Sequence, residues 1–339
     1  MRAPAFWWQA TPSSLAHLLR PASLIYGGIA GRRMRRQGIQ AELPVICIGN
    51  FTAGGAGKTP TALAVADLLE AAGESPAFLS RGYGGKLAGP IEVARHHTAA
   101  DVGDEPLLLA RRGRTIVSHD RPAGTRLAVE IGATVVVMDD GLQNPSLRKD
   151  CAIAVVDGAT GIGNGLPLPS GPLRAPLATQ WRAVHAVLVI GSGTAGEAVA
   201  REAERYGKRV FFGRLAPDPT VAGSLRGKRV LAFAGIGRPE KFFDTLRECG
   251  AAVERMNAFA DHRSFRAADL ERLRKEARDA GLQAVTTEKD LARIAGSHLT
   301  EHWPDLVALP VRLTLEDESA FRNFLLRHVE ERRIDAMSS

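Results

Sequence analysis

The sequence predicts an α/β fold with a mostly parallel β-sheet flanked by helices. From Pro44 onward, short runs of aliphatic and β-branched residues alternate with helical patterns, which is what repeated βαβ units produce. One of these runs, Val45 to Gly49, is followed at once by a glycine-dense loop and then by a helical pattern. Sheets of this type bind ligands at the carboxyl ends of their strands, so we look for a site there.

The composition limits the class of protein. With 339 residues, of which 45% are hydrophobic, the chain is long enough for two domains with ordinary cores. A formal net charge of +7 favours anionic partners such as nucleotides or lipid surfaces. We expect no nucleic-acid partner, because only 6% of residues are aromatic and no known nucleic-acid module is recognisable. The three cysteines lack metal-ligand spacing and predict free thiols.

Residues 1–43 form the first predicted section, an N-terminal amphipathic segment at a membrane interface. Apolar residues recur there at helical spacing, at positions 15, 18, 19, 22, 25, 26 and 29, and Pro21 predicts a break into two short helices. Aromatic residues 6–8 precede this pattern, and a cluster of arginines follows it: Arg32, Arg33, Arg35 and Arg36. Such a segment binds an anionic membrane surface, or it packs as an ordinary amphipathic helix on its own domain.

Residues 44–180 form the second predicted section, a nucleotide-binding core. The loop after the first strand reads Thr52-Ala53-Gly54-Gly55-Ala56-Gly57-Lys58-Thr59. Its backbone N–H groups can surround phosphate oxygens, Lys58 can neutralise the outer phosphates, and the Thr59 hydroxyl can bind Mg²⁺. The usual pattern has glycine at the position of Thr52, so the loop alone also fits a plain glycine turn. With strand and helix in place, we predict a P-loop NTPase-like fold.

Two carboxylate positions are candidates for chemistry in this core. The apolar run Thr134 to Met138 leads into Asp139 and Asp140, which would hold Mg²⁺ beside the phosphate loop or would simply open a turn. Asp104 precedes a helical pattern, where it is either a helix N-cap or a base that accepts a proton from a hydroxyl group.

Residues 181–335 form the third predicted section, a second α/β part that partly completes the core and closes over the site. Residues 306–313 are predicted to form one strand. Gly235-Ile236-Gly237 is too short for a dinucleotide motif, and Thr287 with Asp290 has the spacing of a helix cap. Arg174, in a proline-rich loop, would bind a substrate phosphate or a surface group. His262 is a lone loop histidine that could share a proton with a carboxylate.

Taken together, the motifs resemble one family, the tetraacyldisaccharide 4′-kinases of lipid A biosynthesis. The matching segments occur in the family's order and cover nearly the whole chain: residues 49–60, 80–84, 103–106, 139–141, 171–174, 235–237, 261–262 and 286–290. The family's phosphate loop also carries threonine at the position of Thr52. This joint match is far more specific than any single motif.

The resemblance implies a peripheral enzyme on the cytoplasmic face of the inner membrane. We infer no obligate protein partner. The resemblance also implies transfer of the γ-phosphoryl group of ATP, with Mg²⁺, to the 4′-hydroxyl of a tetraacylated glucosamine disaccharide 1-phosphate. By motif, Asp104 resembles the family's catalytic carboxylate and His262 its paired histidine. The other positions carried over are the metal-side acids Asp139 and Asp140, and Tyr83 and Arg174 near the acceptor and phosphates.

Three positions depart from the family, which usually has Phe, His and Glu where this chain has Leu142, Asn144 and Ala175. Two other functions remain open from the residues alone. One is a P-loop kinase or ligase that acts on a soluble metabolite, and the other is a nucleotide-switched membrane adaptor without a phosphoryl acceptor. An assay with a lipid acceptor separates these alternatives.

Overall fold

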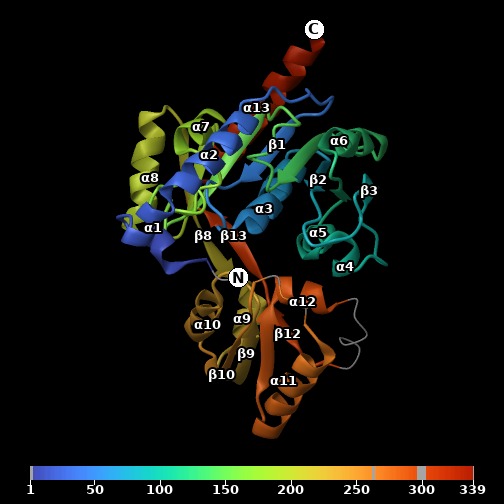
Figure 1. Ribbon diagram of the computed structural model, residues 1–339. Helices are drawn as coiled ribbons and strands as arrows, with labels where there is room; N and C mark the ends of the chain where they lie inside the picture. The colour runs from blue at the N-terminus through green and yellow to red at the C-terminus, as the bar shows by residue number, and fades with distance from the viewer. Residues whose placement is uncertain (1–2, 262, 264, 296–302, 339) are drawn as a thin grey trace.

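The structure is a computed structural model that describes residues 3–261, 263, 265–295 and 303–338 (Figure 1). The described residues form two α/β domains, a larger one around a nine-stranded sheet and a smaller one around a four-stranded sheet. A helical segment at the N-terminus packs on the larger domain. The predicted fold class is therefore confirmed, including the second, smaller α/β domain.

The sheet of the larger domain has the strand order β13-β8-β7-β6-β1-β5-β2-β4-β3. Its strands are β1 (Val45–Gly49), β2 (Pro76–Ser80), β3 (Ile91–Glu92), β4 (Thr115–Val117), β5 (Val135–Asp139), β6 (Cys151–Asp157), β7 (Ala186–Ile190), β8 (Arg209–Pro217) and β13 (Val311–Leu315). Neighbours run parallel except at the edges, where β3 pairs with β4 and β13 with β8 in antiparallel fashion. Strand β1 lies between β5 and β6, with Ile48 opposite Asp139, so the loop after β1 and the acids after β5 share one edge of the sheet.

Helices cover both faces of this sheet. Their bounds are α3 (Lys58–Glu70), α4 (Ala99–Val102), α5 (Asp104–Ala110), α6 (Arg121–Glu130), α7 (Leu177–Arg182), α8 (Thr194–Arg205) and α13 (Glu318–Met337). Successive side chains of a strand point to opposite faces. Accordingly, Val45 and Cys47 of β1 pack in the core under α6, α7 and α8, and Ile46 and Ile48 pack in the core under α3, α5 and α13.

The smaller domain lies below the larger one in Figure 1. Its four strands are parallel in the order β10-β9-β11-β12. The elements are α9 (Pro219–Leu225), β9 (Arg229–Ala234), α10 (Pro239–Glu248), β10 (Ala252–Ala258), α11 (Ala267–Ala280), β11 (Gln283–Thr287), α12 (Glu288–Ile294) and β12 (Val307–Leu309). Helices α9 and α10 pack on one face of this sheet and α11 on the other.

The single strand predicted over residues 306–313 is wrong. The structure has two strands there, β12 in the small sheet and β13 in the large sheet, with Pro310 between them. Proline has no backbone N–H and ends strand pairing, while its carbonyl oxygen accepts a hydrogen bond from the N–H of Asp218 at 2.9 Å. The chain therefore crosses between the domains twice, after β8 and before β13.

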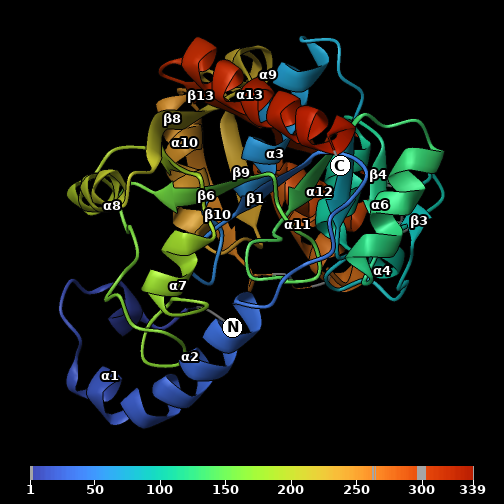
Figure 2. The same ribbon diagram turned by 90° about the horizontal axis from the view of Figure 1, so that it is seen from above.

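The N-terminal segment contains η1 (Ala5–Trp8), α1 (Ser14–Leu18) and α2 (Arg20–Met34) and lies along the outside of the larger domain beside α7 (Figure 2). The predicted break near Pro21 is present, since α1 ends at Leu18 and Pro21 lies in the first turn of α2.

Small residues form the contact between α2 and the proline-rich loop. The Ser23 hydroxyl donates to the carbonyl oxygen of Pro167 at 2.7 Å. A Cβ atom added to Gly27 would lie 3.3 Å from the Pro167 ring, and one added to Gly31 would lie 3.3 Å from the Pro176 ring. The segment thus packs on its own domain through a helix face whose small residues let the two backbones come close together.

The large apolar side chains of α2 are on its other side. Leu24, Ile25 and Ile29 are 69%, 68% and 67% exposed. An amphipathic helix that packs only on its own domain would bury such residues. No helix among the described residues has both the length and the apolar content to cross a bilayer.

Candidate active site

The predicted phosphate loop forms the turn from β1 into α3. Gly57 is the N-cap of this helix and has a left-handed backbone with φ 92°, which favours glycine. The 13-residue helix then starts at Lys58, so its N-terminal N–H groups and its positive dipole end face the loop. The Lys58 side chain is nearly buried, with Nζ 3.5 Å from the Gly54 carbonyl oxygen and 3.7 Å from Asp140 Oδ2.

Thr52, the unusual first position of the loop, pairs with the proline-rich segment. It forms an antiparallel bridge with Leu173, and the N–H of Ala53 donates to the Pro172 carbonyl oxygen at 2.7 Å. An extended backbone is needed for this pairing, and a β-branched residue suits it. The loop is therefore held from outside by residues 172–174.

Asp139 is a buried carboxylate at the end of β5. Thr59 donates its hydroxyl hydrogen to Asp139 Oδ2 at 3.2 Å, whereas Oδ1 is buried without a hydrogen-bond partner among the described residues. Burial first, and then the negative charge of Glu105, raises the pKa of the Asp139 carboxyl to about 7. A buried carboxylate oxygen that lacks a partner beside a threonine hydroxyl is a suitable half-site for a hard cation.

Asp140, the next residue, has the opposite electrostatic environment. It adopts φ 55°, and its carboxylate accepts a hydrogen bond from Arg174 Nη1 at 2.6 Å. Burial alone would raise its pKa, but the charges of Lys58 and Arg174 lower the pKa to about 2. Among the described residues, no group of three or more His, Cys, Asp or Glu could hold a metal ion by itself. A cation here therefore needs oxygens from Thr59 and from bound phosphates as well.

Of the two residues expected near the substrates, Arg174 lies within the donor site and Tyr83 lies on the surface. Arg174 connects the two parts of the donor site, because its Nε donates to the Thr52 carbonyl oxygen at 3.0 Å while Nη1 binds Asp140. The Tyr83 side chain is 67% exposed. Its backbone packs against the start of α5, since a Cβ atom on Gly103 would lie only 2.5 Å from the Tyr83 carbonyl oxygen.

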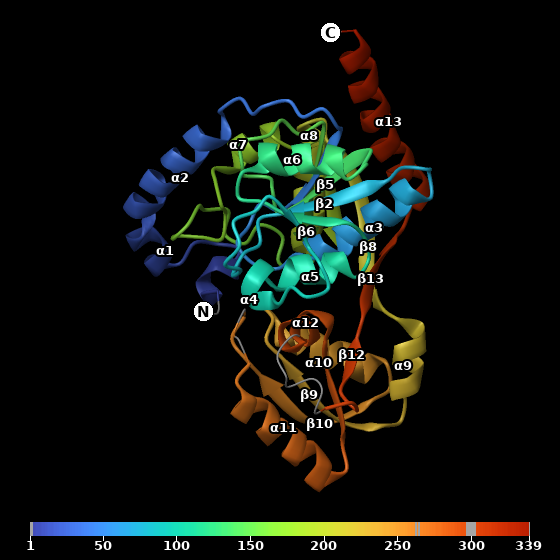
Figure 3. The same cartoon turned by 90° about the vertical axis from the view of Figure 1, so that its right-hand side faces the viewer.

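Asp104 is not the N-cap of α5, so that interpretation of the sequence is wrong. Gly103 takes the cap position with φ 87°, and Asp104 is the first residue of the helix. Its side chain is nearly buried and points across the domain boundary, where Arg293 Nε donates to Oδ2 at 2.6 Å and Lys289 Nζ lies 3.9 Å away. Figure 3 shows α12, which carries both cations, directly below α4 and α5.

The predicted helix cap at Thr287 is present. The Thr287 hydroxyl accepts from the N–H of Asp290 at 3.1 Å and donates to Asp290 Oδ2 at 2.7 Å. Asp290 is fully buried and also accepts from the N–H of Gly235 at 2.9 Å. The predicted catalytic His262 lies outside the described residues.

Leu142, Asn144 and Ala175, the three departures from the family pattern, have structural contacts here. Leu142 is buried under Gly49, where an added Cβ would lie 2.5 Å from the Leu142 Cβ. Asn144 accepts from the N–H of Ser146 at 2.8 Å, and Ala175 is fully buried.

The charged residues that join the domains were not predicted from the sequence. Arg293 and Lys289 of α12 contact Asp104 and Glu105 of α5. A second group pairs Asp157, at the end of β6, with Lys241 at 2.9 Å and with Arg238. Asp157 could have been found as a polar residue at the carboxyl end of a buried strand. Arg293 gave no signal beyond its position one helical turn after Asp290.

Comparisons with known proteins place these features in one family. A family model described as tetraacyldisaccharide-1-P 4′-kinase matches residues 15–330. The tetraacyldisaccharide 4′-kinase of Methylobacterium nodulans is 56% identical over 321 residues, which cover 94% of each chain. That of Rhodopseudomonas palustris is 50% identical over 334 residues, or 98% of each chain. Among solved structures, an "apo" form of LpxK from Aquifex aeolicus in complex with ATP has a TM-score of 0.71 at 26% identity and covers 93% of this chain and 99% of that chain.

Proposed function

Since the chain belongs to the tetraacyldisaccharide-1-P 4′-kinase family, we propose that its two domains contribute different groups to one phosphoryl transfer. The enzyme is an ATP-dependent kinase of lipid A biosynthesis, which phosphorylates the 4′-hydroxyl of a tetraacylated disaccharide 1-phosphate. These matches do not favour a kinase or ligase for a soluble metabolite, nor a nucleotide-switched adaptor. In this proposal, the section formed by residues 181–335 partly completes the core and closes over the site.

The donor half is the phosphate loop, residues 52–59. Its N–H groups and the N-terminus of α3 bind the phosphates of ATP, and Lys58 neutralises charge on the β- and γ-phosphates as the bond to the leaving oxygen lengthens. Arg174 holds Asp140 and the carbonyl oxygen of Thr52, so it keeps the loop and the acidic turn in fixed register. Arg174 and Tyr83 are also our candidates for contacts with the substrates.

Thr59, Asp139 and Asp140 are the residues that would hold Mg²⁺. The buried Asp139 Oδ1 without a hydrogen-bond partner among the described residues supports this assignment, as does the oxygen-only donor set. When bound, the cation neutralises phosphate charge in the transition state.

The acceptor half is centred on Asp104. A sugar hydroxyl is too weak an acid to ionise at neutral pH, so a positioned carboxylate that accepts its proton late in the transfer assists the reaction. The observation that carries this role is the nearly buried Asp104 carboxylate, which does not cap its helix and points into the domain boundary. The adjacent Glu105 acts electrostatically on Asp139, which supports proximity of α5 to the donor site. We propose that His262 shares the proton with Asp104, on the family resemblance alone.

Two substitutions test the division into donor and acceptor groups. With γ-labelled ATP and a lipid A disaccharide 1-phosphate, Lys58→Ala is expected to lower both ATP affinity and lipid labelling, the latter by about a hundredfold or more. Asp104→Ala is expected to bind ATP normally and to lower lipid labelling by about a hundredfold to ten-thousandfold. The exposed residues Lys275 and Asp244 provide matched controls, as Lys275→Ala and Asp244→Ala. Transfer close to the control rate in either test variant would refute the role of that residue.

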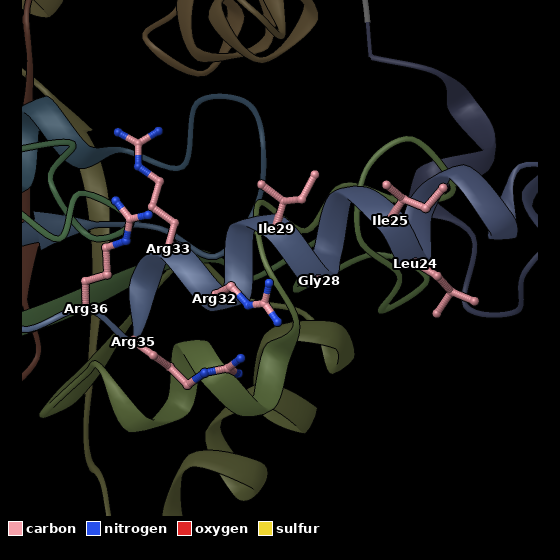
Figure 4. Close-up of a pocket in the computed structure, with 8 residues that line it drawn as sticks. All are labelled: Leu24, Ile25, Gly28, Ile29, Arg32, Arg33, Arg35 and Arg36. Carbon is pink, nitrogen blue, oxygen red and sulfur yellow. The ribbon is translucent and has the colours of Figure 1, made fainter.

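We further propose that the enzyme is peripheral to the cytoplasmic face of the inner membrane and binds through α2. An open groove on this helix is lined by apolar residues toward its N-terminal half and by arginines at its C-terminal end (Figure 4): Leu24, Ile25, Gly28, Ile29, Arg32, Arg33, Arg35 and Arg36. The apolar side chains would enter the interface while the guanidinium groups bind anionic headgroups, each worth about 1 kcal/mol near the surface.

Vesicle binding tests this orientation. A variant with Leu24→Ser, Ile25→Ser and Ile29→Ser is expected to lose affinity for vesicles that contain anionic lipid, because these exposed side chains do not support the fold. A control changes Ile334 and Met337 of α13, which are 62% and 80% exposed and lie outside the N-terminal segment, to serine. Equal binding by both variants would contradict the proposed surface.

A further inference from the structure

Arg293 is a buried cation to which the reaction described above assigns no task. Its side chain is 5% exposed, although it extends from α12 of the smaller domain to Asp104 of the larger one. The Arg293 Nε donates a hydrogen bond to Asp104 Oδ2 at 2.6 Å. The Arg293 Nη2 forms an ion pair with the same oxygen, also at 2.6 Å. Two nitrogens of a planar group on one carboxylate oxygen restrict how the carboxylate can turn.

The other side of the Arg293 guanidinium is held in a rigid frame. Nη1 donates to Asp290 Oδ1 at 2.7 Å and to the carbonyl oxygen of Gly235. Asp290 is in turn fixed by the Thr287 hydroxyl and by the N–H of Gly235. The frame thus joins Gly235, from the motif at residues 235–237, to Thr287 and Asp290, from the motif at residues 286–290.

Gly235 is needed for this frame to form. A Cβ atom at this position would lie 3.1 Å from Asp290 Oδ1 and 3.3 Å from Arg293 Nη1. Both distances are shorter than ordinary contacts, and both neighbours are fully or almost fully buried, so they have little room to move. A glycine here therefore allows the backbone to serve as both donor and acceptor within the frame.

We propose that Arg293 is a positioning residue of the phosphoryl transfer, which keeps the Asp104 carboxylate ionised and correctly oriented from the opposite domain. This inference rests on the role proposed for Asp104. A guanidinium at 2.6 Å favours the ionised form of a carboxyl group, and a frame that fixes the guanidinium also fixes the direction in which the carboxylate accepts a proton. Among the residues that the structure describes, charged groups near Asp104 include Lys289 of α12, Glu105 of α5 and Asp261, which lies 3.8 Å from Arg293 Nη2.

The alternative is that Arg293 only ties the two domains together. The chain supplies a control for this, because Lys241, although its side chain is 55% exposed, also reaches from the smaller domain to a buried carboxylate of the larger one, Asp157, at 2.9 Å. A residue that only connects the domains would give the same kinetic effect as Lys241 when its charge is removed.

Steady-state kinetics and pH profiles of Arg293→Gln, Arg293→Lys and Lys241→Gln test the inference. Arg293→Gln is expected to lower kcat by about ten- to a hundredfold with little change in KM for ATP. In the pH profile of kcat/KM for this variant, the acid limb is expected to move to higher pH, because loss of the cation raises the pKa of the Asp104 carboxyl. Arg293→Lys restores the acid limb but not the full kcat, since an ammonium group lacks the planar fork. Lys241→Gln keeps the wild-type pH profile.

Folding of each variant is checked by circular dichroism and thermal unfolding, because Arg293→Gln leaves the buried Asp290 carboxylate without its cationic partner. Arg293→Gln combined with Asp290→Asn removes both charges and is expected to show the same kinetic loss. If neither variant folds, Arg293→Lys decides: a lower kcat at unchanged KM for ATP supports the inference, and wild-type kinetics overturn it.

A double-mutant cycle shows whether Arg293 acts through Asp104. In an Asp104→Asn background, Arg293→Gln is expected to cause no further loss of the residual transfer. A full additional loss in the Asp104→Asn background would overturn the inference about Arg293 but not the role of Asp104. The same holds if the kinetics of Arg293→Gln match those of Lys241→Gln. If Asp104→Asn itself transfers at the wild-type rate, the role proposed for Asp104 fails, and this inference fails with it.

Discussion

Asp139→Asn should change how the stability of the nucleotide-free protein depends on pH. Burial, and then the charge of Glu105, raises the pKa of the Asp139 carboxyl from 3.8 to about 7. In the unfolded chain the carboxyl ionises near its ordinary value, so between the two values the folded state holds a proton that the unfolded state has lost. The stability of the wild type therefore falls as the pH rises through this window, whereas asparagine has no proton to lose.

The size of the effect follows from the shift. Each pH unit within the window lowers the free energy of unfolding of the wild type by about 1.4 kcal/mol, so the loss from about pH 5 to about pH 8 is roughly 3 kcal/mol. Groups that have no electrostatic interaction with Asp139 cancel in the comparison, because they titrate alike in both proteins. Asp140, with a pKa lowered to about 2, stays ionised throughout.

Urea unfolding of both proteins, with a chelator and without nucleotide, measures this difference at several pH values between about 5 and 8. The free energy of unfolding of Asp139→Asn minus that of the wild type is expected to increase with pH up to about pH 7 and then to level off. Any constant offset reflects the changed hydrogen bonding of the amide and does not affect the slope. A difference that stays flat across the window would refute the raised pKa of Asp139 and its explanation by burial.

Three further results are expected from single substitutions. Gly57→Ala should weaken ATP binding, measured by calorimetry, because its Cβ would lie 2.7 Å from Ile190 Cδ1 on a backbone with φ 92°; unchanged affinity would contradict the loop geometry. His185→Gln should flatten the loss of stability on acidification. Burial lowers the pKa of His185 from 6.5 to about 4, so between these pH values the unfolded state binds a proton that the folded state does not; an unchanged acid profile in urea unfolding would argue against this. Gly27→Leu should make α2 accessible to proteases, because a larger side chain cannot fit against Pro167, and equal proteolysis of variant and wild type would refute that packing.

The parts of the site that are close in sequence could be predicted from it. Gly57, Lys58 and Thr59 follow a buried strand directly, and Asp139 ends another, so local pattern and sheet topology together place them at one edge. The acceptor side of the site could be predicted only in part from the sequence. Asp104 was recognised, but its partner Arg293 is 189 positions away, and nothing in the local sequence of a short helix shows which side chain it meets.

Strands were missed for a related physical reason. Strand β10 carries Glu254, Arg255 and Asn257 and is largely exposed, so its sequence lacks the apolar run that reveals β1 or β5. The domain crossing at Pro310 was read as one continuous strand, because both halves are aliphatic and only their sheet partners differ.

We propose that Asp104 accepts the proton of the 4′-hydroxyl while the phosphate loop holds the donor. Single-turnover transfer of a labelled γ-phosphoryl group from pre-bound ATP to the lipid disaccharide tests it most directly, with wild type and the isosteric Asp104→Asn compared across the pH range. We predict that the variant binds ATP as the wild type does, transfers about a hundredfold or more slowly, and lacks the acid limb of the wild-type profile. Transfer at the wild-type rate with the wild-type pH dependence would contradict the account.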